Sequence, residues 1–292
     1  MSYNFTSGEH LLQICQEKNM TIYDVCINRE MEMTSLTKEE VIEKMARSLQ
    51  IMKDAIKKSQ TEDIKSMGGL IGGEGKKLAN YRNSSRSVCG SLMNKAMAAA
   101  MGTMEVNASM GLIVAAPTAG SCGILPGAIV TIGDEYGFSD EELINSLFTA
   151  GAIGAIITRN ATVAGAEGGC QAETGAAAAM AAAGVVELMG GTPEEAIHAS
   201  SHCLQNVMGL ICDPIAGLVE APCQGRNAIG VANALISSEL VLAGIYNIIP
   251  FDETVEAMYT VGKGLPMELR ETALGGVAAT CTGCSLTKKI FN

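Results

Sequence analysis

The chain has 292 residues, 48% of them hydrophobic, so it can bury a large core as one big domain or two ordinary ones. A formal net charge of -11 and an aromatic content of 4% argue against nucleic-acid binding, which needs basic surface and stacking rings. Ten cysteines in a chain of this length, with no basic and apolar signal segment at the N-terminus, are typical of the reducing cytoplasm.

Charge divides the chain into two parts. Residues 1–65 carry 20 charged side chains, whereas the 185 residues of 66–250 carry only 22. We predict that residues 1–65 form a charged N-terminal helical layer and that residues 66–292 form the helical core of the same domain. Glutamates interrupt the Ala-rich and Gly-rich apolar stretches before they reach the roughly 20 apolar residues of a membrane span, so we expect buried helices of a soluble protein.

Two helix starts are marked in the charged part. Thr21 with Asp24, and Thr37 with Glu40, have the spacing in which a hydroxyl caps a helix and an acid reaches back to the backbone. The helix that follows Thr37 carries apolar side chains at intervals of three and four, which predicts that one face packs on the core. These apolar side chains are Val41, Met45, Leu49, Met52 and Ile56.

The remaining chain is also predicted to be helical. Strand signals are limited to Leu112–Ala115 and Ile129–Ile132, which are too few and too short for a sheet of alternating strands and helices. We therefore predict an all-α fold, a single large domain with Ala/Gly-rich buried helices. The expected helices cover residues 84–104, 139–158 (after the cap Ser139), 170–189, a segment that starts at Thr192-Pro193, and 225–247.

Three cysteines lie outside regular helix patterns. Cys170, Cys212 and Cys223 each stand in a short stretch dense in glycine, proline or acid, whereas a packing cysteine is normally part of an apolar helix face. Three converging thiolates would leave one coordination position of a metal or cluster open for chemistry. The alternative is three buried free thiols, and the spacing alone does not decide between the two because no C-x-x-C run joins these cysteines.

A loop of small residues is a second candidate site. The sequence Ala-Pro-Thr-Ala-Gly-Ser-Cys-Gly covers residues 116–123 and leads into an apolar run. Backbone amides exposed by Gly120, together with the hydroxyls of Thr118 and Ser121, could hold a carboxylate at a helix start. A simple break between helices is the competing interpretation.

The glycine-rich stretch over residues 68–77 resembles a phosphate-binding loop only superficially. It lacks the required glycine spacing, and no Ser or Thr follows Lys76. Lys76 on a mobile loop that reaches an acidic substrate is one reading. An exposed lysine on a flexible loop is the other.

Four motifs taken together carry a family resemblance. They are Pro-Thr-Ala-Gly-Ser-Cys-Gly-Ile-Leu-Pro-Gly, Gly-Ala-Glu-Gly-Gly-Cys-Gln-Ala-Glu, Gly-Leu-Ile-Cys-Asp-Pro-Ile-Ala-Gly-Leu-Val-Glu-Ala-Pro-Cys and Arg-Asn-Ala. The chain resembles, over essentially its whole length, the alpha chain of iron-sulfur-dependent L-serine dehydratase. The resemblance implies an all-helical catalytic domain that converts L-serine to pyruvate and ammonia. It also implies a [4Fe-4S] cluster bound by Cys170, Cys212 and Cys223, with one iron lacking a protein thiolate.

The resemblance leaves the catalytic base unknown. The open iron would act as a Lewis acid on the substrate hydroxyl, with Thr118, Gly120, Ser121 and Lys76 as candidate substrate-binding residues. The histidines of the chain lie outside the glycine-rich motifs. Because other family members carry a further N-terminal portion, either fused or as a separate beta chain, we expect a separate beta chain, with a base on that partner as one alternative. We also expect an oligomer.

The other cysteines have weaker assignments. Cys281 and Cys284 form a C-x-x-C that can cap the cluster in a resting state, form a redox pair or belong to a solvated tail. Cys122 in the small-residue loop is a further potential ligand. The others lie in helical patterns and are expected to be core residues, namely Cys15, Cys26, Cys89 and Cys203.

Three rival functions remain at this point. A related iron-sulfur lyase could act on L-cysteine or L-threonine, since a thiol also leaves from the β carbon. A non-catalytic iron-sulfur electron carrier would need a fourth cysteine to complete the coordination shell. A pyridoxal phosphate enzyme is disfavoured, because that cofactor commonly binds to folds of repeating strands and helices.

Overall fold

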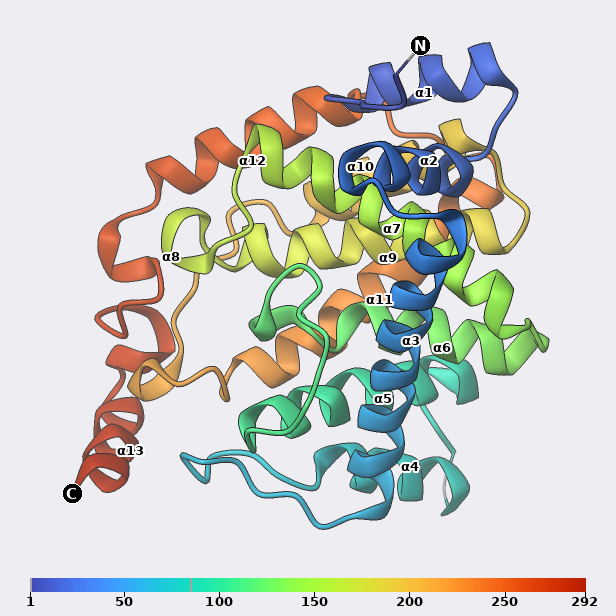
Figure 1. The fold of residues 1–292 in the computed structure, drawn as a ribbon. Coiled ribbons are helices and arrows are strands. Elements are labelled where there is room, and N and C mark those ends of the chain that lie inside the picture. Colours follow the sequence, from blue (N-terminus) through green and yellow to red (C-terminus); the bar gives the residue numbers. More distant parts are fainter. Residues whose placement is uncertain (1, 85) are drawn as a thin grey trace.

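The computed structural model describes residues 2–84 and 86–292, and these residues contain thirteen α-helices and a few shorter helical turns (Figure 1). The helices are α1 (Gly8–Lys18), α2 (Ile22–Thr34), α3 (Lys38–Thr61), α4 (Glu74–Ser84), α5 (Gly90–Ala108), α6 (Ile124–Tyr136), α7 (Asp140–Asn160), α8 (Gly165–Gly168), α9 (Ala176–Leu188), α10 (Pro193–Asn206), α11 (Cys223–Leu242), α12 (Phe251–Gly264) and α13 (Cys281–Phe291). The prediction of an all-α fold is confirmed.

Helix α9 lies at the centre of the core. Its alanines are fully buried, and it packs against α6, α7, α10 and α11, which surround it in Figure 1. Small side chains allow this close packing: a β carbon added at Gly184 would lie 2.9 Å from the backbone oxygen of Ser146 on α7. The scarcity of large aromatic residues is therefore compensated by helix backbones that approach closely.

The N-terminal helices pack directly on this core. Helix α2 lies against α7, and α3 lies against α5, α6 and α7. The apolar side chains of α1, α2 and α3 join the same cluster of buried side chains as those of α6, α7 and α9. Both predicted caps are confirmed, because the Thr21 hydroxyl accepts from the amide of Asp24 and Thr37 forms a reciprocal capping box with Glu40.

In the second part of the chain, two helices start where their caps predicted, whereas α4 was not predicted. Helices α7 and α10 begin after Ser139 and Thr192, each with a complete capping box. The helix expected over 84–104 begins instead at Gly90, and α4 precedes it. Helix α4 escapes local prediction because its cap comes from a distant helix: a carboxylate oxygen of Glu105 accepts from the amides of Glu74 (2.5 Å) and Gly75 (3.1 Å).

The two strand signals do not form strands. Ile129–Ile132 lies inside α6, and Leu112–Ala115 is irregular. A short apolar run cannot distinguish a buried strand from a helix that is buried on nearly all sides, as α6 is. Within the described residues, β pairing is limited to an isolated parallel bridge between Cys212 and Arg270.

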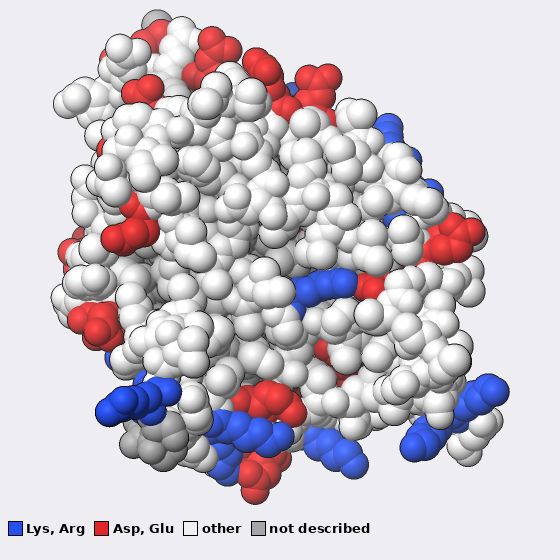
Figure 2. All heavy atoms as spheres, turned by 180° about the vertical axis from the view of Figure 1, so that it is seen from behind, with Lys and Arg blue, Asp and Glu red and all other residues white. Residues whose placement is uncertain are grey.

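Two further features of the fold are the distribution of its surface charge and the apolarity of its helices. Figure 2 shows that the charged side chains on this face gather mainly near its margins, with acidic and basic groups interspersed and no continuous basic stripe. Across the described ranges, none of the helices combines the length and the apolarity that crossing a bilayer requires.

Candidate metal centre

The three predicted cysteines lie on three separate elements of the fold. Cys170 precedes the π-helical turn η2 (Gln171–Gly175) that leads into α9, Cys212 lies in the segment after α10, and Cys223 is the first residue of α11. All three thiols are buried, with 3%, 1% and 5% of the residue exposed. They are free cysteines without disulfide partners.

The tightest grouping consists of two of these cysteines and an acid. The Sγ atoms of Cys170 and Cys212 and a carboxylate oxygen of Glu173 all lie within 4.8 Å of one another. Cys223 stands outside this group, yet it is close enough to respond to its charge. Burial, followed by the negative charges of Cys170 and Glu173, raises the pKa of the Cys223 thiol to about 12.

Hydrogen bonds divide the protons unequally between Cys170 and Cys212. The pKa of Cys170 is lowered by the hydrogen bond from the Cys212 thiol and by the nearby Arg226 cation, against the opposing effect of burial. The pKa of Cys212 is raised by the same hydrogen bond and by burial. Cys170 is therefore the sulfur of the group that most favours the thiolate form.

Arg226 and Asp213 form a buried ion pair beside Cys170. Nη1 of Arg226 donates to Cys170 Sγ (3.1 Å), and Nη2 donates to Asp213 Oδ1 (2.5 Å). The Arg226 side chain is 12% exposed and that of Asp213 is 2% exposed. The ion pair therefore places its positive charge beside Cys170, whose sulfur lies near the Cys212 thiol and the carboxyl of Glu173.

Glu173 connects the cysteines with the small-residue loop. The Thr118 hydroxyl donates to Glu173 Oε1 (2.8 Å), and the hydroxyl oxygens of Thr118 and Ser121 lie 3.1 Å apart. A β carbon at Gly120 would lie 3.2 Å from Glu173 Oε1, so glycine permits this approach. Burial raises the pKa of Glu173 to about 7, and the Thr118 hydrogen bond opposes that rise.

The candidate substrate-binding residues are distributed over two places. Thr118, Gly120 and Ser121 adjoin the cysteine group through Glu173. Lys76 lies in the first turn of α4, where its Nζ makes an ion pair with Asp63 Oδ1 at 2.6 Å. The glycine-rich stretch is thus a loop that ends at Gly73 and a helix that begins at Glu74, and Lys76 belongs to the helix.

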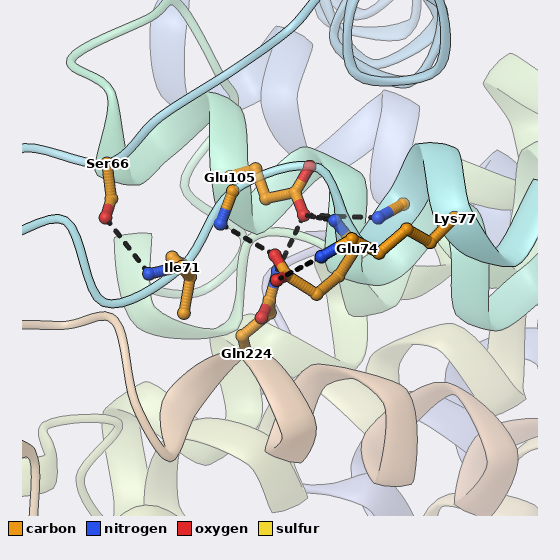
Figure 3. A network of polar contacts seen from close by, with 8 residues as sticks. Ser66, Ile71, Glu74, Lys77, Glu105 and Gln224 are labelled. Carbon is orange, nitrogen blue, oxygen red and sulfur yellow. Dashed lines mark hydrogen bonds and ion pairs between the residues drawn. The ribbon is translucent and has the colours of Figure 1, made fainter.

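The glycine-rich loop is fastened by residues on both sides of Cys223. The buried carboxylate of Glu220 accepts from the Ser66 hydroxyl (2.7 Å) and from the amides of Gly68 (2.6 Å) and Leu70 (3.0 Å). Gln224 Nε2 donates to Glu105 Oε1 (2.9 Å), the oxygen that caps α4 (Figure 3). The segment around Cys223 and the loop therefore hold each other in position.

The C-terminal segment contacts the backbone around Cys212. The amide of Cys212 donates to the Leu269 carbonyl (2.8 Å), and the amide of Glu271 donates to the Cys212 carbonyl (2.7 Å). Further along, the amide of Val277 donates to Asp213 Oδ2 (2.6 Å). Residues 269–277 thus fix the backbone on which Cys212 stands.

The remaining cysteines differ in exposure. Cys15, Cys26 and Cys203 are buried core residues, as predicted. The prediction for Cys89 is wrong: it is exposed and precedes α5, because that helix starts later than expected. The loop residue Cys122 is buried, and burial raises the pKa of its thiol to about 12. Exposed Cys281 and Cys284 lie in the first turn of α13.

Sequence reasoning missed Glu173 and Arg226 as members of the centre. Both stand in motifs that were recognised, three residues after Cys170 and three residues after Cys223, respectively. That spacing places a side chain on the same helical face as the cysteine, and this was the available signal.

The donor set fits a thiolate-bound metal cofactor. Soft sulfur donors select iron-sulfur clusters, zinc or copper(I), and the buried Arg226 offsets the negative charge that several thiolates would bring. Two sulfurs with an adjoining carboxyl and hydroxyls, and with the Cys223 thiol nearby, match a centre that reacts with a polar substrate better than a closed four-sulfur site.

Comparison with known proteins gives a consistent family. The family described as serine dehydratase alpha chain matches residues 17–278. The probable L-serine dehydratase alpha chain of Bacillus subtilis is 47% identical over 98% of this chain and 95% of its own length. The L-serine dehydratase alpha chain of Peptoniphilus asaccharolyticus is 47% identical over 95% of both chains.

A longer relative matches in part of its length. L-serine dehydratase TdcG of Escherichia coli is 34% identical over 94% of this chain, and the match covers 62% of that protein. The sequence motifs, the helical fold and the matches over nearly the full length agree, and the chain belongs to the serine dehydratase alpha chain family.

Proposed function

We propose that this chain is the catalytic alpha chain of an iron-sulfur-dependent L-serine dehydratase, an ammonia-lyase that converts L-serine to pyruvate and ammonia. The observation that carries the proposal is the buried group of Cys170, Cys212 and Glu173, with Cys223 beside it. The names of relatives that match nearly the whole chain support L-serine as the substrate.

The proposed cofactor is a [4Fe-4S] cluster held by Cys170, Cys212 and Cys223. When bound, such a cluster would supply an open iron as Lewis acid, which takes up the charge of the departing hydroxide. The cysteines would hold it as thiolates, and the lowered pKa of Cys170 favours that form. Burial of all three sulfurs limits the access of water to the centre.

Glu173 is the proposed proton-holding group of the alpha chain. Its carboxyl lies beside two cysteine sulfurs and has a pKa raised to about 7, so it can exchange a proton near neutral pH. The Thr118 hydrogen bond orients it. The proposal has two forms: in one, Glu173 accepts the α proton of the substrate, and in the other, a base on the partner chain accepts it.

The substrate carboxylate is proposed to bind at the small-residue loop. Thr118, Gly120 and Ser121 border Glu173, and a shift of the Thr118 hydroxyl from Glu173 to the substrate would free a donor. Lys76 would contribute only if its ion pair with Asp63 opens, since Nζ is engaged there. Elimination would leave aminoacrylate, which tautomerises and hydrolyses to pyruvate and ammonia.

A separate beta chain is the proposed partner. Full-length matches carry the words alpha chain in their names, whereas the match covers 62% of the longer E. coli relative. We propose that the unmatched part of such longer relatives corresponds to the separate beta chain. We propose a cytoplasmic oligomer of both chains.

The direct experiment is anaerobic reconstitution followed by turnover measurements. We expect the reconstituted protein, together with its partner, to release pyruvate and ammonia from L-serine, and to lose this activity as oxygen destroys the cluster. Comparing L-serine with L-threonine and L-cysteine tests the substrate. A cluster that survives air without any lyase activity would instead support an electron carrier and defeat the proposal.

A further inference from the structure

We infer that Arg226 is a positioning residue of the metal centre, which fixes the Cys170 sulfur and offsets its negative charge. The inference rests on the proposed function, because it concerns the state of Cys170 when a cluster is bound. It goes beyond that function because it proposes that an ion pair, which is not itself a ligand, affects the reduction potential of the cluster and the retention of iron.

The contacts of Arg226 join all three cysteine segments. Arg226 stands three residues after Cys223 on α11, donates through Nη1 to Cys170 Sγ (3.1 Å) and donates through Nη2 to Asp213 (2.5 Å). Asp213 directly follows Cys212. A single guanidinium therefore links the backbone segments that carry the three sulfurs.

Asp213 is itself held in place, which fixes the orientation of Arg226. Its Oδ2 accepts from the amide of Val277 (2.6 Å) in the C-terminal segment. A β carbon at Gly276, which has a φ of +59°, would lie 2.1 Å from the same oxygen, so only glycine fits there. The planar guanidinium can satisfy the sulfur and the carboxylate together, which the point charge of a lysine cannot do in the same way.

The physical consequence is electrostatic. A hydrogen bond to a ligating sulfur and a nearby cation both stabilise the more negative, reduced state of an iron-sulfur cluster, which raises its reduction potential. Outer groups that orient metal ligands commonly contribute about 10-fold to 100-fold to metal affinity. Arg226 is therefore expected to affect both the potential and the retention of iron.

The test compares four variants of the chain under anaerobic conditions. Arg226→Gln removes the charge, Arg226→Lys keeps the charge without the planar fork, and Arg226→Gln combined with Asp213→Asn removes both charges of the ion pair. Arg47→Gln, at an exposed position on α3, is the matched control. The readouts are iron and sulfide per chain, the rate of iron loss to a chelator, and the reduction potential of the cluster.

We expect Arg226→Gln to lose iron about 10-fold faster and to have a more negative potential, with Arg226→Lys intermediate and Arg47→Gln unchanged. If Arg226→Gln fails to fold because Asp213 is left buried and unpaired, the double variant decides the question. It should also lose iron faster, and its potential should shift in the same direction but by less, because losing the Asp213 charge opposes the effect of losing the Arg226 charge.

The result that would overturn the inference is a cluster of unchanged potential and unchanged iron retention in Arg226→Gln, or in the double variant. In that case the proposed function would still stand. Failure of the parent protein to take up any cluster would defeat the proposed function and the inference with it, so the two failures are distinguishable.

Discussion

Glu173 and Arg226 place an acid and a cation beside the sulfur of Cys170. Cys170, Cys212 and Cys223 could be selected from sequence because glycine, proline and acid around them are unusual for packing cysteines. Glu173 and Arg226 could not be assigned in the same way. Their roles depend on contacts with segments more than 50 residues away, such as the bonds from Thr118 to Glu173 and from Arg226 to Cys170.

The first prediction concerns the three cysteine sulfurs. Cys170→Ser, Cys212→Ser and Cys223→Ser should each abolish binding of the cluster, because an alkoxide ligand replaces a thiolate poorly. Iron and sulfide analysis after anaerobic reconstitution measures this. Cys26→Ser, in the core of α2, is the control and should bind iron normally. A serine variant at any of the three positions with full iron content would contradict the assignment.

The second prediction concerns Glu173. Glu173→Gln preserves the shape of the side chain and can still accept from Thr118, but it cannot take up a proton. We expect kcat for L-serine to fall by about 100-fold or more, with iron content unchanged. Loss of iron would show that Glu173 is a ligand instead. Unchanged kcat would assign the base to the partner chain.

At the level of elements, some helices start where a side chain from a distant part of the chain caps them, and local sequence patterns do not reveal such starts. Helices α7 and α10 could be located from sequence because each carries its own capping box. Helix α4 could not, because its cap is Glu105 from α5. The π-helical turn after Cys170 was also invisible to helix periodicity, and it precedes the long alanine-rich helix that was expected there.

The third prediction concerns Glu187, which joins three helices. Glu187 on α9 accepts from the amide of Ile22 at the start of α2 and from the hydroxyl of Thr149 on α7. Burial raises its pKa from 4.5 to about 7. A carboxyl with a raised folded-state pKa contributes stability that is present below its unfolded pKa and is lost as the pH rises through about 7.

The free energy of unfolding should therefore decrease between about pH 5 and about pH 8, and Glu187→Gln should reduce that decrease by about 1–3 kcal/mol. Urea unfolding over this pH range measures the effect. Glu195→Gln at the exposed start of α10, where the folded pKa is lowered, is the comparison and should not flatten the same decrease. Identical pH profiles for wild type and Glu187→Gln would refute the prediction.

At the scale of the whole molecule, the scarcity of strand signals predicted the fold class, but it could not predict how the helices meet. Alanine and glycine indicated close helix packing, which α9 and α7 show at Gly184. The assembly of the centre from the segments after α8, after α10 and at the start of α11 is a property of the complete fold. The spacing left open whether the three cysteine motifs meet, and the structure brings Cys170 and Cys212 together beside Glu173.

The fourth prediction concerns the partner. The alpha chain alone should bind the cluster, since the proposed ligands belong to it, but it should turn over L-serine far more slowly than the reconstituted pair of chains. Pyruvate release measured with and without a beta chain tests this, with Cys170→Ser alpha chain plus beta chain as the inactive control. Full turnover by the lone alpha chain would remove the need for a partner.

Mössbauer spectroscopy of the anaerobic, reconstituted protein, recorded with and without L-serine, tests the central claim most directly. Three cysteine ligands leave one iron of the proposed cluster for the substrate, so L-serine should change the signal of that iron and leave the others as they were. Four irons with equivalent thiolate ligation, unaffected by L-serine, would contradict the account.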